Sequence, residues 1–316
     1  MTAVLAALLA LCVFPGLLFA AAGGLAAEFV DRKLHARMQN RVGPPWFQPL
    51  ADFVKLLSKE ELIPGQADRF VFRAMPILAL AAATTALFCI PLFGPRAISR
   101  FEGDALVVLY LLTLPTLSFF LGGWASTSPY ASIGSMRSLT QLFAYEVPLL
   151  MVLMAPGLLA GSWSLSGMAL FFQAHALLAL SNLPGLCVAL VALLGKLEKV
   201  PFDLAEAETE IVAGTFTEYS GRRLAFFRLA VDVEAVVAAS LLASVFLPWG
   251  LSLPLAATVP LYLFKVLAVL FVLALLRTIL ARLRLEQMLE FCWKWLAPAA
   301  MLQLLISVLL AGGLSR

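Results

Sequence analysis

The chain has 316 residues, of which 62% are hydrophobic and 13% charged, and its formal net charge at pH 7 is +3. Soluble domains are nearer half apolar and a quarter charged, so a soluble enzyme, a disordered chain and a secreted disulfide scaffold are excluded. With 22 Lys and Arg against 19 Asp and Glu, the balance also gives no sign of a nucleic-acid partner. The apolar runs match the length of bilayer-spanning helices, which predicts an all-α polytopic membrane protein.

The apolar runs and the residues that interrupt them predict eight transmembrane helices within one membrane domain covering residues 1–316. These spans are expected near residues 2–27, 76–93, 105–125, 139–159, 174–194, 224–247, 254–276 and 293–314. Two connections, residues 28–75 and 195–223, are long and unusual, whereas the outer ones are short. No internal repeat is visible, which disfavours an inverted-repeat transporter.

The basic residues orient this bundle. Of the 22, 17 fall in the first, third, fifth and seventh connections, whereas the second, fourth and sixth hold only Arg96 and Arg100. The positive-inside rule therefore places the odd connections in the cytoplasm. With an even number of spans, we expect both termini outside.

The first long connection predicts an amphipathic helix. Pro44 and Pro45 end one segment and open the next helix, because Pro is tolerated in a first turn. Apolar residues then recur at helical spacing, at Trp46, Phe47, Leu50, Phe53, Val54 and Leu57. Polar residues take the opposite arc, at Gln48, Asp52, Lys55, Lys59 and Glu60. Such a helix lies in the membrane interface. It serves either as a surface anchor or as a docking platform for a cytoplasmic partner.

The second long connection concentrates carboxylates, at Asp203, Glu206, Glu208, Glu210 and Glu218. A helix over residues 203–212 would place Asp203, Glu206 and Glu210 on one face. Like charges at that spacing repel and titrate as a coupled set, which is a basis for accepting protons. The alternative is a solvated acidic helix, and apolar neighbours such as Phe202 and Ile211 argue against it.

Ionisable residues inside the spans form a third signal, since each costs several kcal/mol unless it is paired or hydrated. Glu146 lies in the motif FAYEVPLL, where Pro148 can kink the helix and make room for water. We predict a buried proton site at Glu146. Four more such residues lie in the sixth and seventh spans, Asp232, Glu234, Lys265 and Arg277. For Asp232 and Arg277, a structural ion pair or snorkelling is an equal alternative.

Motifs for chemistry within the chain are missing. We find no Gly-rich phosphate loop, no nucleophile elbow and no metal-ligand spacing, and the four cysteines lie singly. We therefore expect no redox centre, metal or cofactor in this chain. Carboxylates in a cytoplasmic connection and in a span instead suggest a proton path coupled to a partner protein.

Five segments carry a family resemblance, in the order RMQNRVGPP, QPLADFVKLLSKE, EVPL, PFDLAEAETEIVAGTFTEYSG and RLRLEQMLEFCWKWLAP. Together they resemble the ND-one type of membrane subunit, which is common to respiratory complex I and the energy-converting hydrogenases. The resemblance covers nearly the whole chain. It implies an eight-span protein of the prokaryotic inner membrane with both termini outside, which joins a membrane arm to a soluble arm.

The resemblance also implies roles for individual residues. A set of acids matches the family's glutamate-lined proton channel, namely Glu146, Asp203, Glu206, Glu208, Glu210 and Glu218. A second set matches the first-connection segment facing the peripheral arm, namely Arg32, Arg41, Asp52, Lys55, Lys59 and Glu60. Asp31 stands where complex I members usually have Glu. The implied partners are soluble subunits with the cofactors, antiporter-like membrane subunits and the lipid bilayer.

Two departures separate the branches of this family. Quinone-reducing members have an extra glycine-bearing stretch before the LQPxAD motif, whereas here Gly43 is followed after four residues by Gln48. The PFDLAEAETE form also resembles the hydrogenase branch, including formate hydrogenlyase. We therefore expect a membrane anchor and coupling subunit of an energy-converting hydrogenase, with nickel–iron and iron–sulfur centres in the hydrogenase large and small subunits. It would link their redox chemistry to H⁺ or Na⁺ translocation.

The alternative is the quinone-site membrane subunit of a respiratory NADH-quinone oxidoreductase, although no residue is predicted to bind quinone. Two further classes are a stand-alone secondary transporter and a purely structural scaffold. The amphipathic first connection argues against the transporter, and the cost of burying Glu146 argues against the scaffold.

Overall fold

The computed structural model describes residues 9–314, apart from the side chains of Glu208, Thr209 and Leu314. Residues 2–8 of the first expected span lie outside this range. The described residues form helices and no strands, in agreement with the predicted all-α membrane protein. The helices are α2 (Leu17–Met38), α3 (Gln48–Ser58), α4 (Arg69–Ala86), α5 (Asp104–Ala125), α6 (Pro129–Ala160), α7 (Leu165–Ala174), α8 (Ala176–Leu180), α9 (Leu183–Lys196), α10 (Glu208–Ile211), α11 (Gly221–Phe246), α12 (Leu255–Ile279), α13 (Leu285–Phe291) and α14 (Ala297–Leu314).

Within the described range, seven helices are long and apolar enough to cross a membrane. They are Leu9–Met38, Arg69–Cys89, Asp104–Ala125, Pro129–Ala160, Gly221–Phe246, Leu255–Ile279 and Leu285–Gly313. The fifth of the eight expected spans is not one helix but is divided between α8 and α9, with α7 preceding them. The polar pair Ser181 and Asn182 interrupts this run, and Pro184 fits only the first turn of a new helix.

Other spans also begin or end beyond their expected bounds, and the last one starts at Leu285 and not near residue 293. The helix expected to end at residue 27 continues to Met38, so Asp31 and Arg32 lie in α2 and not in a connection. Helix α4 starts at Arg69, because Asp68 accepts hydrogen bonds from the first-turn amides of Phe70 and Val71. Helix α6 starts ten residues earlier than expected, with a proline in its first turn.

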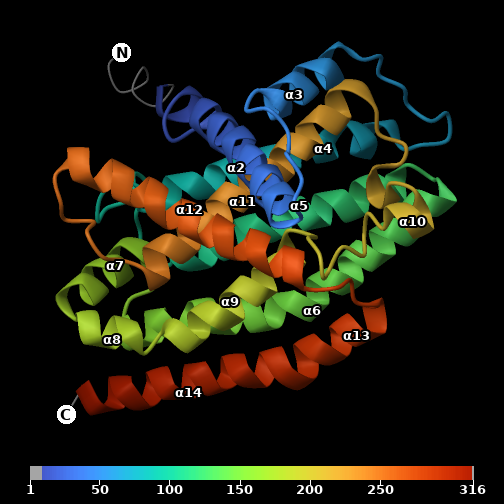
Figure 1. Ribbon diagram of the computed structural model, residues 1–316. Coiled ribbons are helices and arrows are strands. Elements are labelled where there is room, and N and C mark those ends of the chain that lie inside the picture. The colour runs from blue at the N-terminus through green and yellow to red at the C-terminus, as the bar shows by residue number, and fades with distance from the viewer. Residues whose placement is uncertain (1–8, 315–316) are drawn as a thin grey trace.

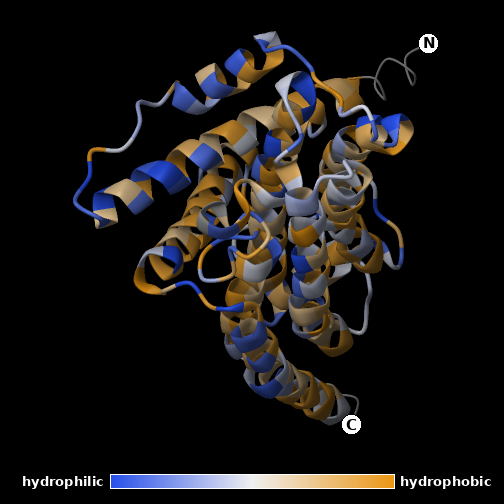
Figure 2. Ribbon diagram, turned by 90° about the vertical axis from the view of Figure 1, so that its right-hand side faces the viewer, coloured by the Kyte–Doolittle hydropathy of each residue, from blue (hydrophilic) through white to orange (hydrophobic). Residues whose placement is uncertain are grey.

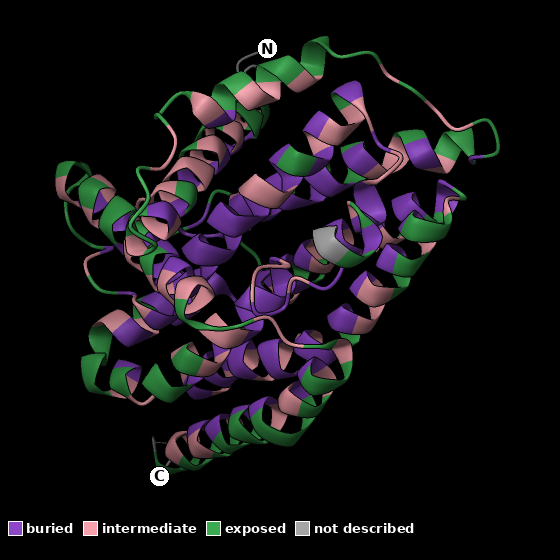
Figure 3. Ribbon diagram, turned by 45° about the vertical axis from the view of Figure 1, so that its right-hand side comes forward, coloured by how far each residue is buried: buried purple, intermediate pink, exposed green. Residues whose placement is uncertain are grey.

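The helices run side by side as a bundle (Figure 1). The first turns of α2 and the last turns of α14 lie at one end of this bundle, and α3, α10 and α13 lie at the other. The view onto this second end shows hydrophilic residues along α3 and the connecting segments, between helices rich in hydrophobic residues (Figure 2). Buried residues gather in the middle of the bundle, where α11 packs against α2, α4 and α12 (Figure 3). Which side of the membrane each end faces stays a prediction from charge.

The acidic connection, residues 197–220, folds back into the bundle. Phe202, Leu204 and Phe216 are buried, and α10 is a single turn. The helix considered over residues 203–212 is therefore wrong, and its carboxylates do not share a helix face. The chain turns instead at Gly214, whose φ of +51° is in the left-handed region. A Cβ at Gly134 of α6 would meet the Thr215 amide nitrogen at 2.6 Å, so only glycine allows this close approach.

Candidate functional site

A charged cavity of about 430 Å³ lies between α2, α3, α11 and the start of the acidic connection. Its walls carry eight carboxylates and five cations, whose side chains come from elements far apart in the sequence. The acids are Glu28, Asp31, Asp52, Glu198, Asp203, Glu206, Asp232 and Glu234, and the bases are Arg32, Lys196, Lys199, Arg228 and Arg277. Such a concentration of charge is costly inside a membrane bundle unless the groups are paired or hydrated.

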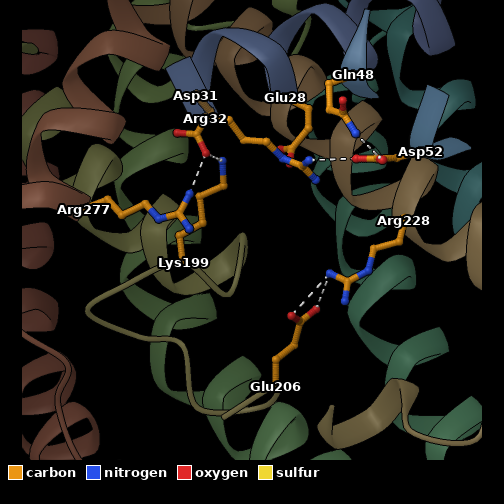
Figure 4. A network of polar contacts seen from close by, with 9 residues as sticks. All are labelled: Glu28, Asp31, Arg32, Gln48, Asp52, Lys199, Glu206, Arg228 and Arg277. Carbon is orange, nitrogen blue, oxygen red and sulfur yellow. Dashed lines mark hydrogen bonds and ion pairs between the residues drawn. The ribbon is translucent and has the colours of Figure 1, made fainter. Parts of the chain in front are cut away.

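Asp31 is the centre of one ion-pair network in this cavity (Figure 4). Its Oδ2 atom accepts from Lys199 Nζ at 2.9 Å and from Arg277 Nη1 at 2.7 Å. These contacts join α2, α12 and the segment after α9. From the sequence, Arg277 could form a structural ion pair or snorkel to the membrane surface. The structure shows the ion pair, with Asp31.

A second network joins α2 to α3 (Figure 4). Arg32 pairs with Glu28 one turn earlier, and its Nη1 lies 3.1 Å from Asp52 Oδ2. Gln48 donates to the other Asp52 oxygen at 2.8 Å. Polar residues of α3 thus face α2, and its side chains at Leu50, Val54 and Leu57 are exposed.

The residues predicted to face the peripheral arm do not all lie together in the structure. Arg32 and Asp52 come together in the cavity, while the rest of the set lies at the surface, at Arg41, Lys55, Lys59 and Glu60.

The predicted acids of the connection also separate. Asp203 and Glu206 line the cavity, and Glu206 lies 2.9 Å from Arg228. Glu210 points away and pairs with Arg137 at 2.6 Å, which lowers the pKa of this carboxyl. Glu218 is half-buried and is not among the cavity-lining residues. The side chain of Glu208 lies outside the described residues.

Glu198 is a cavity residue that the sequence-derived site omitted. Its carboxylate accepts a hydrogen bond from Ser138 at 2.6 Å. Burial raises the pKa of Glu198 to about 8, an effect that the Ser138 bond opposes and the nearby Glu206 and Glu234 reinforce. At neutral pH this group is therefore mostly protonated. The sequence signal that could have indicated this residue is the position of an acid directly after an apolar run.

Glu146 lies on α6 beyond the inner end of the cavity, within electrostatic reach of Lys196 and Glu234. Its Oε2 atom is buried and makes no hydrogen bond. Two polar neighbours of Glu146 on α6, Gln141 and Tyr145, bond elsewhere. Gln141 donates to the Gly195 carbonyl at 2.6 Å, and the Tyr145 hydroxyl lies 3.1 Å from that of Thr116. The proton-site prediction at Glu146 stays a prediction.

Among the residues that the structure describes, no group of three or more His, Cys, Asp and Glu side chains is arranged to hold a metal ion. What the cavity can do is exchange protons. It holds both ion-paired carboxylates, such as Asp31, and the protonated Glu198, so a change of charge at one group alters the proton affinity of its neighbours.

Comparison with known proteins identifies the class as the membrane component of complex I-like, multi-subunit oxidoreductases. The chain belongs to the NADH dehydrogenase family, whose sequence profile matches residues 9–308. It is 37% identical to "NADH-quinone oxidoreductase subunit 8" of Thermus thermophilus, over 96% of this chain and 86% of that protein. It is also 37% identical to an NADH-quinone oxidoreductase subunit of Thermomicrobium roseum, over 87% of each chain.

A solved structure agrees with this assignment. A chain of the archaeal membrane-bound sulfane sulfur reductase, described as a respiratory membrane complex, superposes with a TM-score of 0.85 and 28% identity. The match covers 97% of this chain and all of that one. The predicted family and the multi-pass location in the prokaryotic inner membrane are thus confirmed. In such complexes the cofactors sit in partner subunits.

Proposed function

We propose that this chain couples redox chemistry in a docked soluble module to ion translocation in neighbouring membrane subunits. The observation that carries the proposal is the charged cavity, which extends from α3 to Glu234 inside the bundle. A soluble module bound over α3 and the acidic connection would change the charge at the outer carboxylates Asp52, Asp203 and Glu206. Electrostatic coupling would then shift proton occupancy at Glu234 and Glu146.

The redox partner is proposed to be an NADH-quinone oxidoreductase module, because the curated relatives carry that name at 36–37% identity. The hydrogenase branch is the second candidate. Its support is the short connection after Gly43, where the Lys33 ammonium donates to the Pro44 carbonyl at 3.3 Å and α3 begins directly at Gln48. Mass spectrometry of the subunits that co-purify with the chain separates the two. NADH-binding subunits support the first branch, and a nickel–iron large subunit replaces it with the second.

The coupling role is tested with Glu146→Gln and Glu206→Gln in the intact complex, reconstituted in liposomes. We expect redox turnover to continue while the ions moved per electron fall roughly tenfold or more, because glutamine cannot take up or release a proton. Glu102→Gln, at an exposed position before α5, is the matched control and keeps the normal ratio. Unchanged coupling in both cavity-side variants would disprove the proposal.

A further inference from the structure

The innermost wall of the cavity contains a buried ion pair between α9 and α11. Lys196 Nζ lies 2.9 Å from Glu234 Oε1, and both side chains are 1% exposed. The same ammonium donates to the Leu112 carbonyl of α5 and lies 5.8 Å from the centre of the Tyr145 ring on α6. Desolvation offsets most of the attraction within such a pair, so stability alone does not account for it.

A second carboxylate competes for this ammonium. Glu146 follows Tyr145 on α6, within electrostatic reach of both Lys196 and Glu234, and it has a buried oxygen without a hydrogen bond. On the cavity side, Glu198 is within electrostatic reach of Glu234. Because Glu198 is mostly protonated, the local charges are two carboxylates, Glu146 and Glu234, and one ammonium, Lys196. A buried carboxylate without a counter-charge takes up a proton.

We infer that Lys196 is a shared counter-ion that keeps one proton between Glu234 and Glu146. In the arrangement observed, Lys196 pairs with Glu234, and Glu146 holds the proton. When Glu234 takes up a proton from the cavity, its ion pair breaks. The ammonium then pairs with Glu146, which releases its own proton to the next group. One proton enters, one leaves, no electron moves and the net charge is unchanged. Lys196 is thus a positioning residue for the proposed coupling function, on which this inference rests.

The test counts protonated carboxyl groups by infrared difference spectroscopy of the carboxylic C=O band in the intact complex. Glu146→Gln should remove one protonated carboxyl, because Glu234 then keeps Lys196 to itself. Glu234→Gln should also remove one, because Lys196 then pairs with Glu146. The double variant should lose no more than either single variant. Lys196→Met should gain one, since both carboxylates then hold protons.

Additive losses in the double variant, or no gain in Lys196→Met, would overturn the shared counter-ion. If Lys196→Met does not assemble, the charge-balanced pair Lys196→Met with Glu234→Gln replaces it. That variant should show the wild-type band, because Glu146 alone is protonated, and a missing band contradicts the inference.

The outcome is separable from the test of coupling. Additive infrared changes together with lost translocation in Glu146→Gln refute the counter-ion and leave the proposed function standing. The expected infrared pattern with translocation unaffected in Glu146→Gln and Glu206→Gln refutes the proposed function. In that case the shared proton is only a local property of the bundle.

Discussion

Two connecting segments at the same end of the bundle use their apolar residues in opposite ways. In residues 39–68, several large apolar side chains face outward, with Trp46 75% exposed and Leu50 and Val54 more than half exposed, although Phe53 and Leu56 line the cavity. In residues 197–220, Phe202, Leu204 and Phe216 are buried. Both segments nevertheless contribute acids to one cavity, through Asp52 and through Asp203 and Glu206.

The first segment is thus a surface segment, and the second is part of the packed framework of the bundle. Packing inside the bundle fixes the position of the acidic connection, so its carboxylates are held at set distances from the groups on α2 and α11. The first segment is joined to α2 by the Arg32–Asp52 ion pair, and its exposed apolar side chains are left facing lipid or another protein. Substitutions should therefore be costly in the second segment and mild in the first, as two pairs of variants can show.

The largest expected effect is at Gly214. Alanine there would have to adopt a positive φ, and its Cβ would meet the Ala205 carbonyl oxygen at 1.7 Å. We expect Gly214→Ala to destabilise the chain by about 4 kcal/mol or more and to block assembly, because backbone atoms cannot move aside. Gly65→Ala in the first segment is the control, with no atom within 4 Å of the added Cβ. Thermal unfolding in detergent measures both, and equal effects would contradict the contrast.

Deleting a ring should have a smaller effect. Phe202 is 1% exposed and packs near Phe291, so Phe202→Ala leaves a cavity and should cost about 3 kcal/mol. Leu50→Ala on the exposed side of α3 should change unfolding in detergent by roughly 0.5 kcal/mol or less. A large loss of stability in Leu50→Ala would show that α3 belongs to the framework.

The pH dependence of stability is a separate test within the acidic connection. The folded-state pKa of Glu198 is about 8 against 4.5 in a model compound, so the native state binds its proton more tightly. The stabilisation is complete below pH 4.5 and is lost as pH rises through 8, and Glu198→Gln should remove this slope. Glu210 has the opposite sign, because Arg137 lowers its pKa and the contribution is lost as pH falls below 4.5. Glu210 is 52% exposed, so solvent screening keeps its effect near zero. Unfolding midpoints across pH check both signs.

The sequence was sufficient for the parts of the fold that depend on long apolar runs. Seven of the eight expected spans correspond to continuous helices, and the amphipathic helix is present, although it starts at Gln48 and not at Pro44 and Pro45. The fifth span failed because average hydropathy does not register two polar residues and a proline within an apolar run. Helix α6 was underestimated because its first ten residues pack against a buried connection and not against lipid.

The site was less predictable, because tertiary packing assembles it. Asp203 and Glu206 were found from their clustering, yet the helix considered for that segment does not exist, since Gly214 and Gly134 allow a tight turn against α6 instead. Asp52 was placed on an outward polar face, but Arg32 draws it inward. Lys196 and Glu198 carry no sequence signal that distinguishes them from the other charges of this connection. Nothing local in the sequence shows that α9 ends inside the bundle.

The break between α8 and α9 has a consequence for how the protein is made. Inside a bilayer, the backbone groups freed at Ser181 need a partner from the protein itself. The partner is Gln303 of α14, which donates to the Ser181 carbonyl at 3.1 Å and to the Asn182 side chain at 3.3 Å. Since the ribosome makes α14 after α8 and α9, the interrupted segment has no such bond until α14 is made. The C-terminal helix thus completes the membrane insertion of a segment made more than a hundred residues earlier.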